Sequence, residues 1–328
     1  MSFFKLQSTW TVPIPAGHPL MGNSAEYVHY LNSVSPGLDV SFRGWSVPVW
    51  YADSATPRFN FQVVSPSAGV QQAIAANGWN LNVPVPDNAL PAGWAEFQAG
   101  EYRDLHMVVI EGNNEWDFFG LYTPLGPNKV TDRVKRYDLA GNGIDQPYTG
   151  ASCRVSPVPL TQGLVTKAEM DAGVIPHAIA FATENIKQDS PGVYPCVTSN
   201  NGQSLDQWAP WLGFRFRLNP SVQISTLNLT PVGLIYAKAL QDYGMILVDK
   251  SGAGPHALYA EDRDNQFPAW GIGFNLSGIP LNLFDLVEPV YAATAPIPDP
   301  VPVPAPEPIP PPIFFPRRRL YRRRMEDR

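Results

Sequence analysis

Segments in which apolar and polar residues alternate, or in which apolar and aromatic residues gather, recur between clusters of glycine, proline and asparagine. Eight of them predict β-strands, at 44–52, 58–64, 105–112, 115–123, 177–183, 212–218, 244–250 and 256–262. An alternation with a period of two suits a strand that places one face against a core. Short strands separated by turn residues therefore predict an all-β fold, either a sandwich or a barrel.

The connection between the third and the fourth of these strands carries its own turn signal. Gly112, Asn113 and Asn114 separate the two apolar runs. Glycine and asparagine tolerate the positive φ angles that a tight hairpin connection needs. The two strands are therefore predicted to pair as a β-hairpin.

Helices are few, and three are predicted where the chain carries helix-end residues. They span 67–78, 166–173 and 230–244. The first has small and apolar residues and ends in Asn-Gly. In the second, Thr166 and Glu169 have the spacing of a capping box. In the third, Thr230 suits the N-cap, Pro231 the first turn, and Gly244 the position just after the helix.

Composition supports the same fold class and sets its size. The 328 residues include 36 prolines and 26 glycines, and 44% are hydrophobic while only 16% are charged. This balance is typical of a β protein and differs from that of a helical bundle or a disordered chain. A chain of this length can bury one large core or two smaller ones. Its two cysteines, Cys153 and Cys196, could form a disulfide or remain free thiols.

The C-terminal end differs from everything before it. From 296 to 312, prolines alternate with small or apolar residues, which favours polyproline II structure and cannot form a core. At ~3.1 Å per residue this stretch would reach roughly 50 Å. The sequence therefore predicts a β-sandwich domain at 1–292, an extended linker at 293–316 and an arginine-rich anchoring tail at 317–328.

Charge is divided unevenly between the body and this tail. From residue 296 onward seven arginines stand against four carboxylates, a net charge of +3, which leaves −9 for the body out of a total of −6. An acidic body argues against one that binds nucleic acid. In the tail, aromatic side chains can dock in an apolar groove while arginines pair with acidic or phosphate groups. The predicted partner-binding residues are Phe314, Phe315, Arg317, Arg318, Arg319, Tyr321, Arg322, Arg323 and Arg324. The alternative is a disordered, solvating tail.

The N-terminal segment lacks the features of a secretion signal. It has one lysine, early polar residues and no apolar run of signal-peptide length. No stretch of the sequence approaches the length that a membrane-spanning helix needs. We therefore expect no membrane span, and export by a route other than a secretion signal.

Two kinds of residue could carry out catalysis on a polysaccharide. Glu115 and Asp117 lie two apart on one strand, so both point to one face about 7 Å apart, a separation that suits glycosidase carboxylates. The alternative is a solvent-facing pair opposite inward aromatic residues. His106 and His177 each open a strand, and either could abstract a proton next to a uronic carboxylate. The alternative there is a partly buried histidine bonded to a backbone carbonyl, and His256, beside glycines, is predicted to lie in a loop.

Tryptophans in turn-rich segments offer a different ligand surface. Flat aromatic faces stack on sugars or on the prolines of a partner, and the candidates are Trp79, Trp94, Trp208 and Trp211. The alternative is that these rings fold back over sheet edges. The segment 137–145 lacks the spacing of a calcium loop, and the sequence has no CxxC, HExxH, GxSxG or phosphate-loop motif. We therefore expect no metal and no cofactor.

Several segments together resemble one bacterial family. They are "NSAEYVHYL" (23–31), "DLHMVVIEGNNEWDFFGLY" (104–122), "GASCRVSPVPLTQGLVTKAEMDAGVIPHAIAFA" (150–182) and "GFRFRLNPS" with "LNLTPVGLIYAKALQDYGMILVDKSG" (213–252). In this order they are similar to a family of poorly characterised, often actinobacterial, extracellular proteins. The similarity covers roughly 20–265, and "GVIPHAIAF" (173–181) is its most distinctive part. The resemblance implies a concanavalin-A-like jelly-roll sandwich, an architecture that many lectins and polysaccharide-cleaving enzymes share.

The chain departs from that family in lacking a secretion signal and in adding the proline-rich linker and arginine tail. This combination predicts a bacteriophage virion component: a structural, decoration or attachment protein on the virion surface, with a displayed sandwich that binds a host or environmental glycan. The expected partners are other virion proteins, reached through the tail, and further copies in a homo-oligomer. The first alternative is a polysaccharide lyase or glycoside hydrolase of jelly-roll type, and the second is a cytoplasmic scaffold whose tail binds nucleic acid.

Overall fold

The computed structural model describes residues 3–4, 8–41, 43–143, 150–188, 192–196, 202–252, 254–261, 276 and 278–291. The predicted linker and arginine tail lie outside these residues. Thirteen strands and five α-helices fall within them, so the predicted mostly-β fold is confirmed. No helix in this part of the chain combines the length and the apolar character that crossing a membrane requires.

The largest sheet has six strands in mixed orientation. In spatial order they are β1 (Leu38–Ser41), β12 (His256–Tyr259), β9 (Ile179–Thr183), β11 (Met245–Lys250), β10 (Arg215–Leu218) and β13 (Phe284–Val287). β1 runs parallel to β12 and β9 runs parallel to β11, while the other neighbours are antiparallel. We call this the six-stranded sheet.

The second sheet has five strands. In spatial order they are β2 (Val49–Tyr51), β6 (Met107–Glu111), β7 (Asn114–Leu121), β8 (Lys129–Asp138) and β4 (Phe61–Val63), and a separate two-stranded ladder joins β3 (Arg58–Phe59) to β5 (Val83–Pro84). β6 and β7 form the predicted hairpin, with Gly112 at φ +58° in its turn. β2 with β6 and β4 with β8 are parallel pairs. A jelly roll joins antiparallel neighbours, so the jelly-roll connectivity is not confirmed.

Five α-helices are present among the described residues, and three of them were predicted from the residues at their ends. They are α1 (Ser24–Val34), α2 (Ala68–Asn77), α3 (Trp94–Gln98), α4 (Lys167–Ala172) and α5 (Pro231–Asp242), with short 3₁₀ turns at Thr9–Thr11, Arg43–Trp45, Ile224–Thr226 and Leu281–Leu283. The three predicted helices are α2, α4 and α5, and the Thr166–Glu169 capping box is present in α4. α1 and α3 were not predicted, because Asn23 and Gly93 begin them without any side-chain cap.

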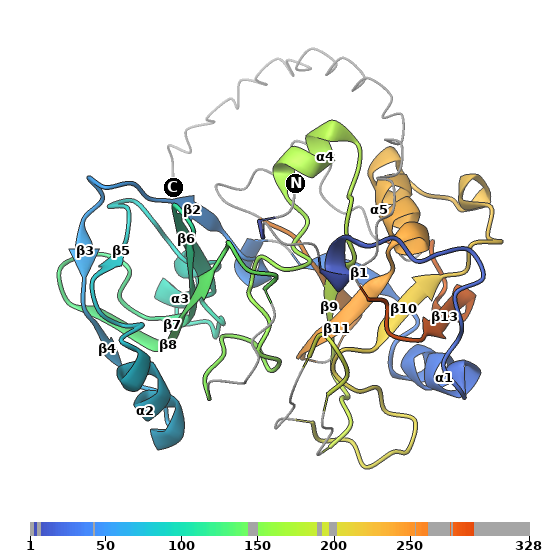
Figure 1. Cartoon of the computed structure of the whole chain (residues 1–328), viewed down its shortest axis with the longest axis horizontal. Coiled ribbons are helices and arrows are strands. Elements are labelled where there is room, and N and C mark those ends of the chain that lie inside the picture. Colours follow the sequence, from blue (N-terminus) through green and yellow to red (C-terminus); the bar gives the residue numbers. More distant parts are fainter. Residues whose placement is uncertain are drawn as a thin grey trace, which may run out of the picture.

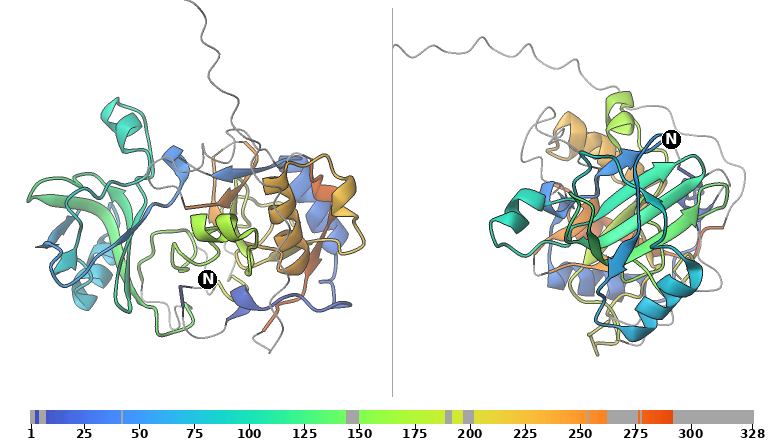
Figure 2. Two further views of the ribbon diagram at one scale, coloured as in Figure 1. Left: turned by 90° about the horizontal axis from the view of Figure 1, so that it is seen from above. Right: turned by 90° about the vertical axis from the view of Figure 1, so that its left-hand side faces the viewer.

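The two large sheets lie face to face, with a chain segment between them. Figure 1 shows the five-stranded sheet on the left and the six-stranded sheet on the right, and the end view in Figure 2 shows the first in front of the second. Strand β6, between β2 and β7, is buried on both faces. Val108 and Ile110 join the large core between the sheets, whereas Met107 and Val109 join a second core under α2.

Residues 150–165, which we call the interlayer segment, run between the two sheets (Figure 1) and hydrogen-bond to both. On the five-stranded side, Lys135 Nζ donates to the Ala151 carbonyl at 2.9 Å. On the six-stranded side, the Ser156 amide donates to the Val248 carbonyl at 3.1 Å. These bonds pair backbone groups of the segment, as a buried loop requires, and link the two sheets.

Gly163 shows how closely the interlayer segment approaches the six-stranded sheet. Its φ is +72°, and a β-carbon there would lie 2.5 Å from the Ala180 amide nitrogen and would also overlap the Trp10 ring. Gly17 has nearly the same φ, +73°, but nothing lies within 4 Å of a β-carbon built on it. The pair separates the effect of backbone conformation from that of close packing.

We predict that Gly163→Ala lowers the free energy of unfolding by about 3 kcal/mol or more. Gly17→Ala should cost only about 1–2 kcal/mol, the penalty for a left-handed non-glycine residue. Urea denaturation of both variants measures the difference. Equal losses in the two variants would contradict the close approach of the segment to β9.

Candidate functional site

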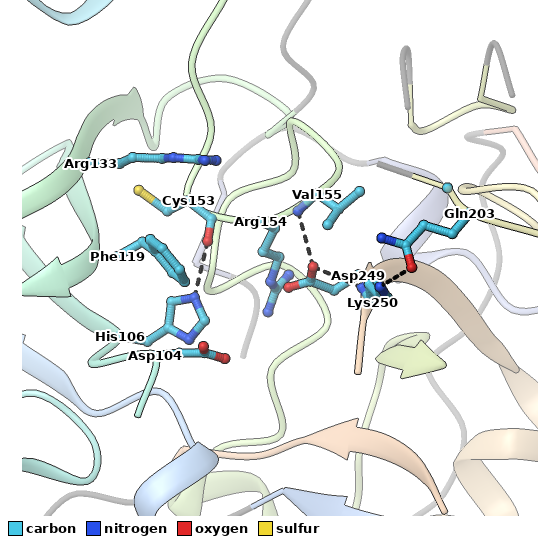
Figure 3. A pocket seen from close by; sticks show the side chains of 11 residues that line it. Asp104, His106, Phe119, Arg133, Cys153, Arg154, Val155, Gln203, Asp249 and Lys250 are labelled. Atoms are coloured by element: carbon cyan, nitrogen blue, oxygen red, sulfur yellow. Dashed lines mark hydrogen bonds between the residues drawn. The ribbon is translucent and has the colours of Figure 1, made fainter. Parts of the chain in front are cut away.

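A cleft opens between the two sheets at the N-terminal end of the interlayer segment. It has a narrow part of about 470 Å³ and a wide part of about 750 Å³, and both are lined by Asp104, His106 and Lys250. The narrow part, shown in Figure 3, is lined by Asp104, His106, Phe119, Arg133, Cys153, Arg154, Val155, Gly202, Gln203, Asp249 and Lys250. The volumes lie in the range typical of small-molecule sites.

His106 stands where the two parts of the cleft meet. Its Nε2 lies 3.0 Å from the Cys153 carbonyl oxygen, and its ring lies beside Phe119 at 5.4 Å (Figure 3). A carbonyl only accepts, so Nε2 donates this hydrogen bond, and no described residue is hydrogen-bonded to Nδ1. The preceding Leu105 has a φ of +51°, a left-handed conformation that persists only where the surroundings fix it, often at functional sites.

Asp249, on β11, bonds the interlayer segment to the six-stranded sheet. Its Oδ1 accepts from the amides of Val155 and Lys250, at 3.0 and 2.9 Å, and its Oδ2 accepts from the Tyr259 hydroxyl at 3.2 Å. The ladder between β11 and β9 shifts register just before Asp249, an irregularity that redirects side chains. Burial raises the pKa of Asp249, although His106 and Arg154 oppose that shift.

Three basic side chains face the narrow part (Figure 3). Arg133 contacts Asp132 at 3.2 Å and donates to the Ser152 carbonyl. Arg154 is buried over the Tyr259 ring, and its guanidinium donates to backbone carbonyls of Pro159, Leu160 and Gln162. Lys250 Nζ donates to Gln203 Oε1 at 2.8 Å.

Two exposed aromatic rings line the wide part. Trp45 is 44% exposed and Tyr102 is 72% exposed, and their ring centroids are 6.4 Å apart. The Arg103 guanidinium lies 5.0 Å from the Trp45 ring centroid on its face. A β-carbon at Gly93 would lie 2.6 Å from Arg103 Cγ, so glycine at that position allows Arg103 to support Trp45.

Of the four candidate catalytic residues, the structure places only His106 in the cleft. Glu115 and Asp117 are fully buried on β7 and face the interlayer segment, so the alternative of a solvent-facing pair is wrong. β7 is buried on both faces, and Trp116 and Phe118 occupy the other one. Asp117 accepts from the Leu160 amide at 2.7 Å, and Glu115 accepts from the Thr161 hydroxyl at 2.5 Å.

Because both carboxyl groups lie in the same buried site, the pKa of each is raised. Burial raises the pKa of Glu115, and burial together with the neighbouring Glu115 raises the pKa of Asp117 well above its usual range. Asp117 Oδ1 has no donor partner among the described residues. These facts favour a protonated Asp117 next to an ionised Glu115, a pair that holds the interlayer segment and does not reach the cleft.

His177 is part of a structural ion pair. Its Nε2 lies 3.2 Å from Glu169 Oε1, and its Nδ1 lies 2.8 Å from the Ala178 carbonyl oxygen. Both nitrogens face acceptors, so the ring carries two protons and has no lone pair for a base. Burial lowers the pKa of His177, but Glu169 outweighs it and the net shift is upward. For Glu169 the two effects are reversed: burial raises its pKa, but His177 outweighs burial and the pKa falls to about 2.

The four predicted tryptophans lie away from the cleft. Trp79 is buried, only 7% exposed, beneath Lys135, so it is not the exposed ligand surface that we predicted. The other three pack on neighbouring rings: Trp94 on Phe97, Trp208 against Tyr27 and Trp211 on Phe214. The aromatic residues of the cleft, Trp45 and Tyr102, were missed because Trp45 was assigned to a strand.

The structure also shows where His256 and the two cysteines lie. His256 lies in β12, not in a loop, and its ring bonds to Thr183 and to the carbonyls of Leu31 and Ser35. Cys153 and Cys196 are free, buried thiols. In the described part of the chain, no group of three or more histidine, cysteine or acidic side chains is placed to hold a metal ion.

Comparison with known proteins gives no relative: no family model, no curated protein and no solved structure matches this chain. The resemblance to the extracellular bacterial family therefore stays a prediction.

We predict that His177→Gln lowers the free energy of unfolding by about 3 kcal/mol, because it removes the cationic ring that offsets the charge of the buried Glu169 carboxylate. The loss should be largest between about pH 4.5 and 6.5. The Glu169 contribution is present above its ordinary pKa of 4.5 and disappears as pH falls towards 2, and the His177 contribution is complete below 6.5 and disappears as pH rises through its raised pKa.

The control is the double variant Glu169→Gln with His177→Gln, because glutamine keeps the capping box. It should be more stable than His177→Gln alone. Denaturation of the three proteins from pH 3 to 9 measures these terms, and a loss that does not vary with pH would contradict the ion pair.

Proposed function

We propose that this protein is a displayed carbohydrate-binding protein of a bacteriophage virion, and that the glycan binds in the cleft between the two sheets. One observation carries the binding part of the proposal: exposed aromatic rings at the wide end of the cleft adjoin a polar interior. Aromatic faces cover the apolar faces of sugar rings, while hydroxyl groups need both donors and acceptors nearby.

The wide part of the cleft supplies these donors and acceptors. Asp39 and Asp104 offer carboxylate oxygens, Ser41 offers a hydroxyl, and Lys250 offers an ammonium group. Trp45 and Tyr102 stand at the same part of the cleft with large exposed fractions. An exposed pair of aromatic rings beside a cavity is a recognised mark of a binding site.

Binding is favoured over the lyase or hydrolase alternative by the distribution of acid and base groups. Glu115, Asp117 and His177 do not line the cleft, and Asp249 already accepts three hydrogen bonds. His106 is therefore the one predicted catalytic residue of the four that a glycan in the cleft would meet. Acid–base cleavage needs at least two groups with separate roles, so a lyase or hydrolase would have to pair His106 with Asp39 or Asp104, the other carboxylates of the cleft.

The virion part of the proposal is supported by the sequence alone. A proline-rich linker that is already extended lowers the ordering cost of binding, and arginines with interleaved aromatic residues suit a protein contact. We propose that 293–316 projects the tail and that 317–328 anchors the protein to other virion proteins. The finer jelly-roll assignment also remains part of this proposal.

We predict that Trp45→Ala weakens glycan binding about 10-fold, because removing a stacked ring costs on the order of 1 kcal/mol. The glycan that binds best on a glycan array is the ligand, and isothermal titration calorimetry measures the change. Trp208→Ala is the matched control and should leave the affinity unchanged. A loss with Trp208→Ala and none with Trp45→Ala would move the site away from the cleft, and no binding to any glycan would contradict the proposal.

We predict that deleting 293–328 abolishes association with phage particles while glycan binding persists, since the cleft lies wholly within the described residues before them. Co-sedimentation with purified particles measures the association. Replacing the arginines of 317–324 by glutamine, with the linker kept, should have nearly the same effect. Undiminished association of both variants would contradict the anchoring role.

A further inference from the structure

We propose that the glycan carries a carboxylate, and that this carboxylate lies in the narrow part of the cleft against Lys250 and Arg133. The inference rests on the proposed glycan binding and specifies its chemical class, an acidic sugar such as a uronic or sialic acid. It is carried by the way charge is distributed along the cleft.

The two parts of the cleft differ in charge. The wide part brings the carboxylates Asp39 and Asp104 together with the single cation Lys250. The narrow part adds Arg133 and Arg154 and only one further carboxylate, Asp249. A ligand with a neutral sugar at one end and an anionic group at the other therefore fits the cleft in one direction, with the anionic group in the narrow part.

Lys250 lines both parts of the cleft and keeps unused hydrogen-bond donors. An ammonium group has three donors, and the described residues take one of them, through the neutral amide oxygen of Gln203 at 2.8 Å. No carboxylate in this part of the chain forms an ion pair with it. A cation in a concave site without an anionic partner attracts an anionic ligand group.

Arg133 and the acidic groups are consistent with this assignment. Arg133 uses Nε for Asp132 and Nη1 for the Ser152 carbonyl, which leaves Nη2 to donate to a ligand. The charge of Arg154 is directed at backbone carbonyls, and it offsets that of Asp249. Asp249 in turn accepts three hydrogen bonds, which direct its oxygens at Val155, Lys250 and Tyr259.

The test compares each acidic sugar with its own neutral form. Oligosaccharides of galacturonate, glucuronate and mannuronate, and sialyllactose, are titrated as free acids and as methyl esters against the full chain. We expect at least one free acid to bind 10-fold or more tightly than its ester. Because the preference is electrostatic, it should shrink as salt is raised from 20 to 300 mM.

Two variants separate charge from steric fit. Lys250→Gln should reduce the preference for the free acid to less than 3-fold while it leaves the affinity for the ester within 2-fold, and Arg133→Gln should act in the same direction. Lys238→Gln, on α5 and outside the cleft, removes the same charge elsewhere and should leave the preference unchanged.

The outcomes are distinguishable from those of the proposed function. Equal binding of acids and esters, an acid preference that Lys250→Gln does not change, or a preference for sulfated over carboxylated sugars would overturn this inference alone. Binding of neither form of any sugar would overturn it together with the proposed function.

Discussion

The structure depends on a buried chain segment that hydrogen-bonds to two sheets at once. The two large sheets share no strand, and the interlayer segment 150–165 lies between them. A buried loop is costly unless its backbone groups are paired. Here they are paired by Glu115 and Asp117 from one sheet, by Asp249 from the other, and by Arg154 within the segment itself. Charged side chains are used because each can accept or donate several bonds to backbone.

The cleft is a consequence of the same segment. Its first residues form the wall of the narrow part, where the Cys153 carbonyl accepts from His106 Nε2 and the Val155 amide donates to Asp249. Glu115 and Asp117 hydrogen-bond to Thr161 and Leu160 of the segment and do not line the cleft. The acidic and basic groups of the protein thus form two sets. One set hydrogen-bonds to the interlayer segment, and a smaller set lines the cleft, where a ligand can contact it.

Local signals in the sequence predicted local structure well. The Gly112 turn and the caps at Thr166 and Thr230 were sufficient, because each acts within a few residues. Strand partners were not predictable, since alternation shows which residues share a face and not which strand lies beside it. Four parallel pairs were therefore unexpected.

The site was predicted only in part for a related reason. His106 was named from its place at the start of a predicted strand, and it lies immediately before β6. Glu115 and Asp117 look like a surface pair in a strand that alternates with aromatic residues, and only the second buried layer reveals their structural role. Trp45 and Tyr102 come from separate segments, and no spacing in the sequence brings them together.

The most direct test of the account is hydrogen–deuterium exchange of the full chain with and without a bound oligosaccharide. If the cleft is the binding site, protection should increase at 101–106 and 249–257, which bring Tyr102, His106 and Lys250 to the ligand. Protection confined to 205–212, around Trp208 and Trp211, with exchange in the cleft unchanged, would contradict it.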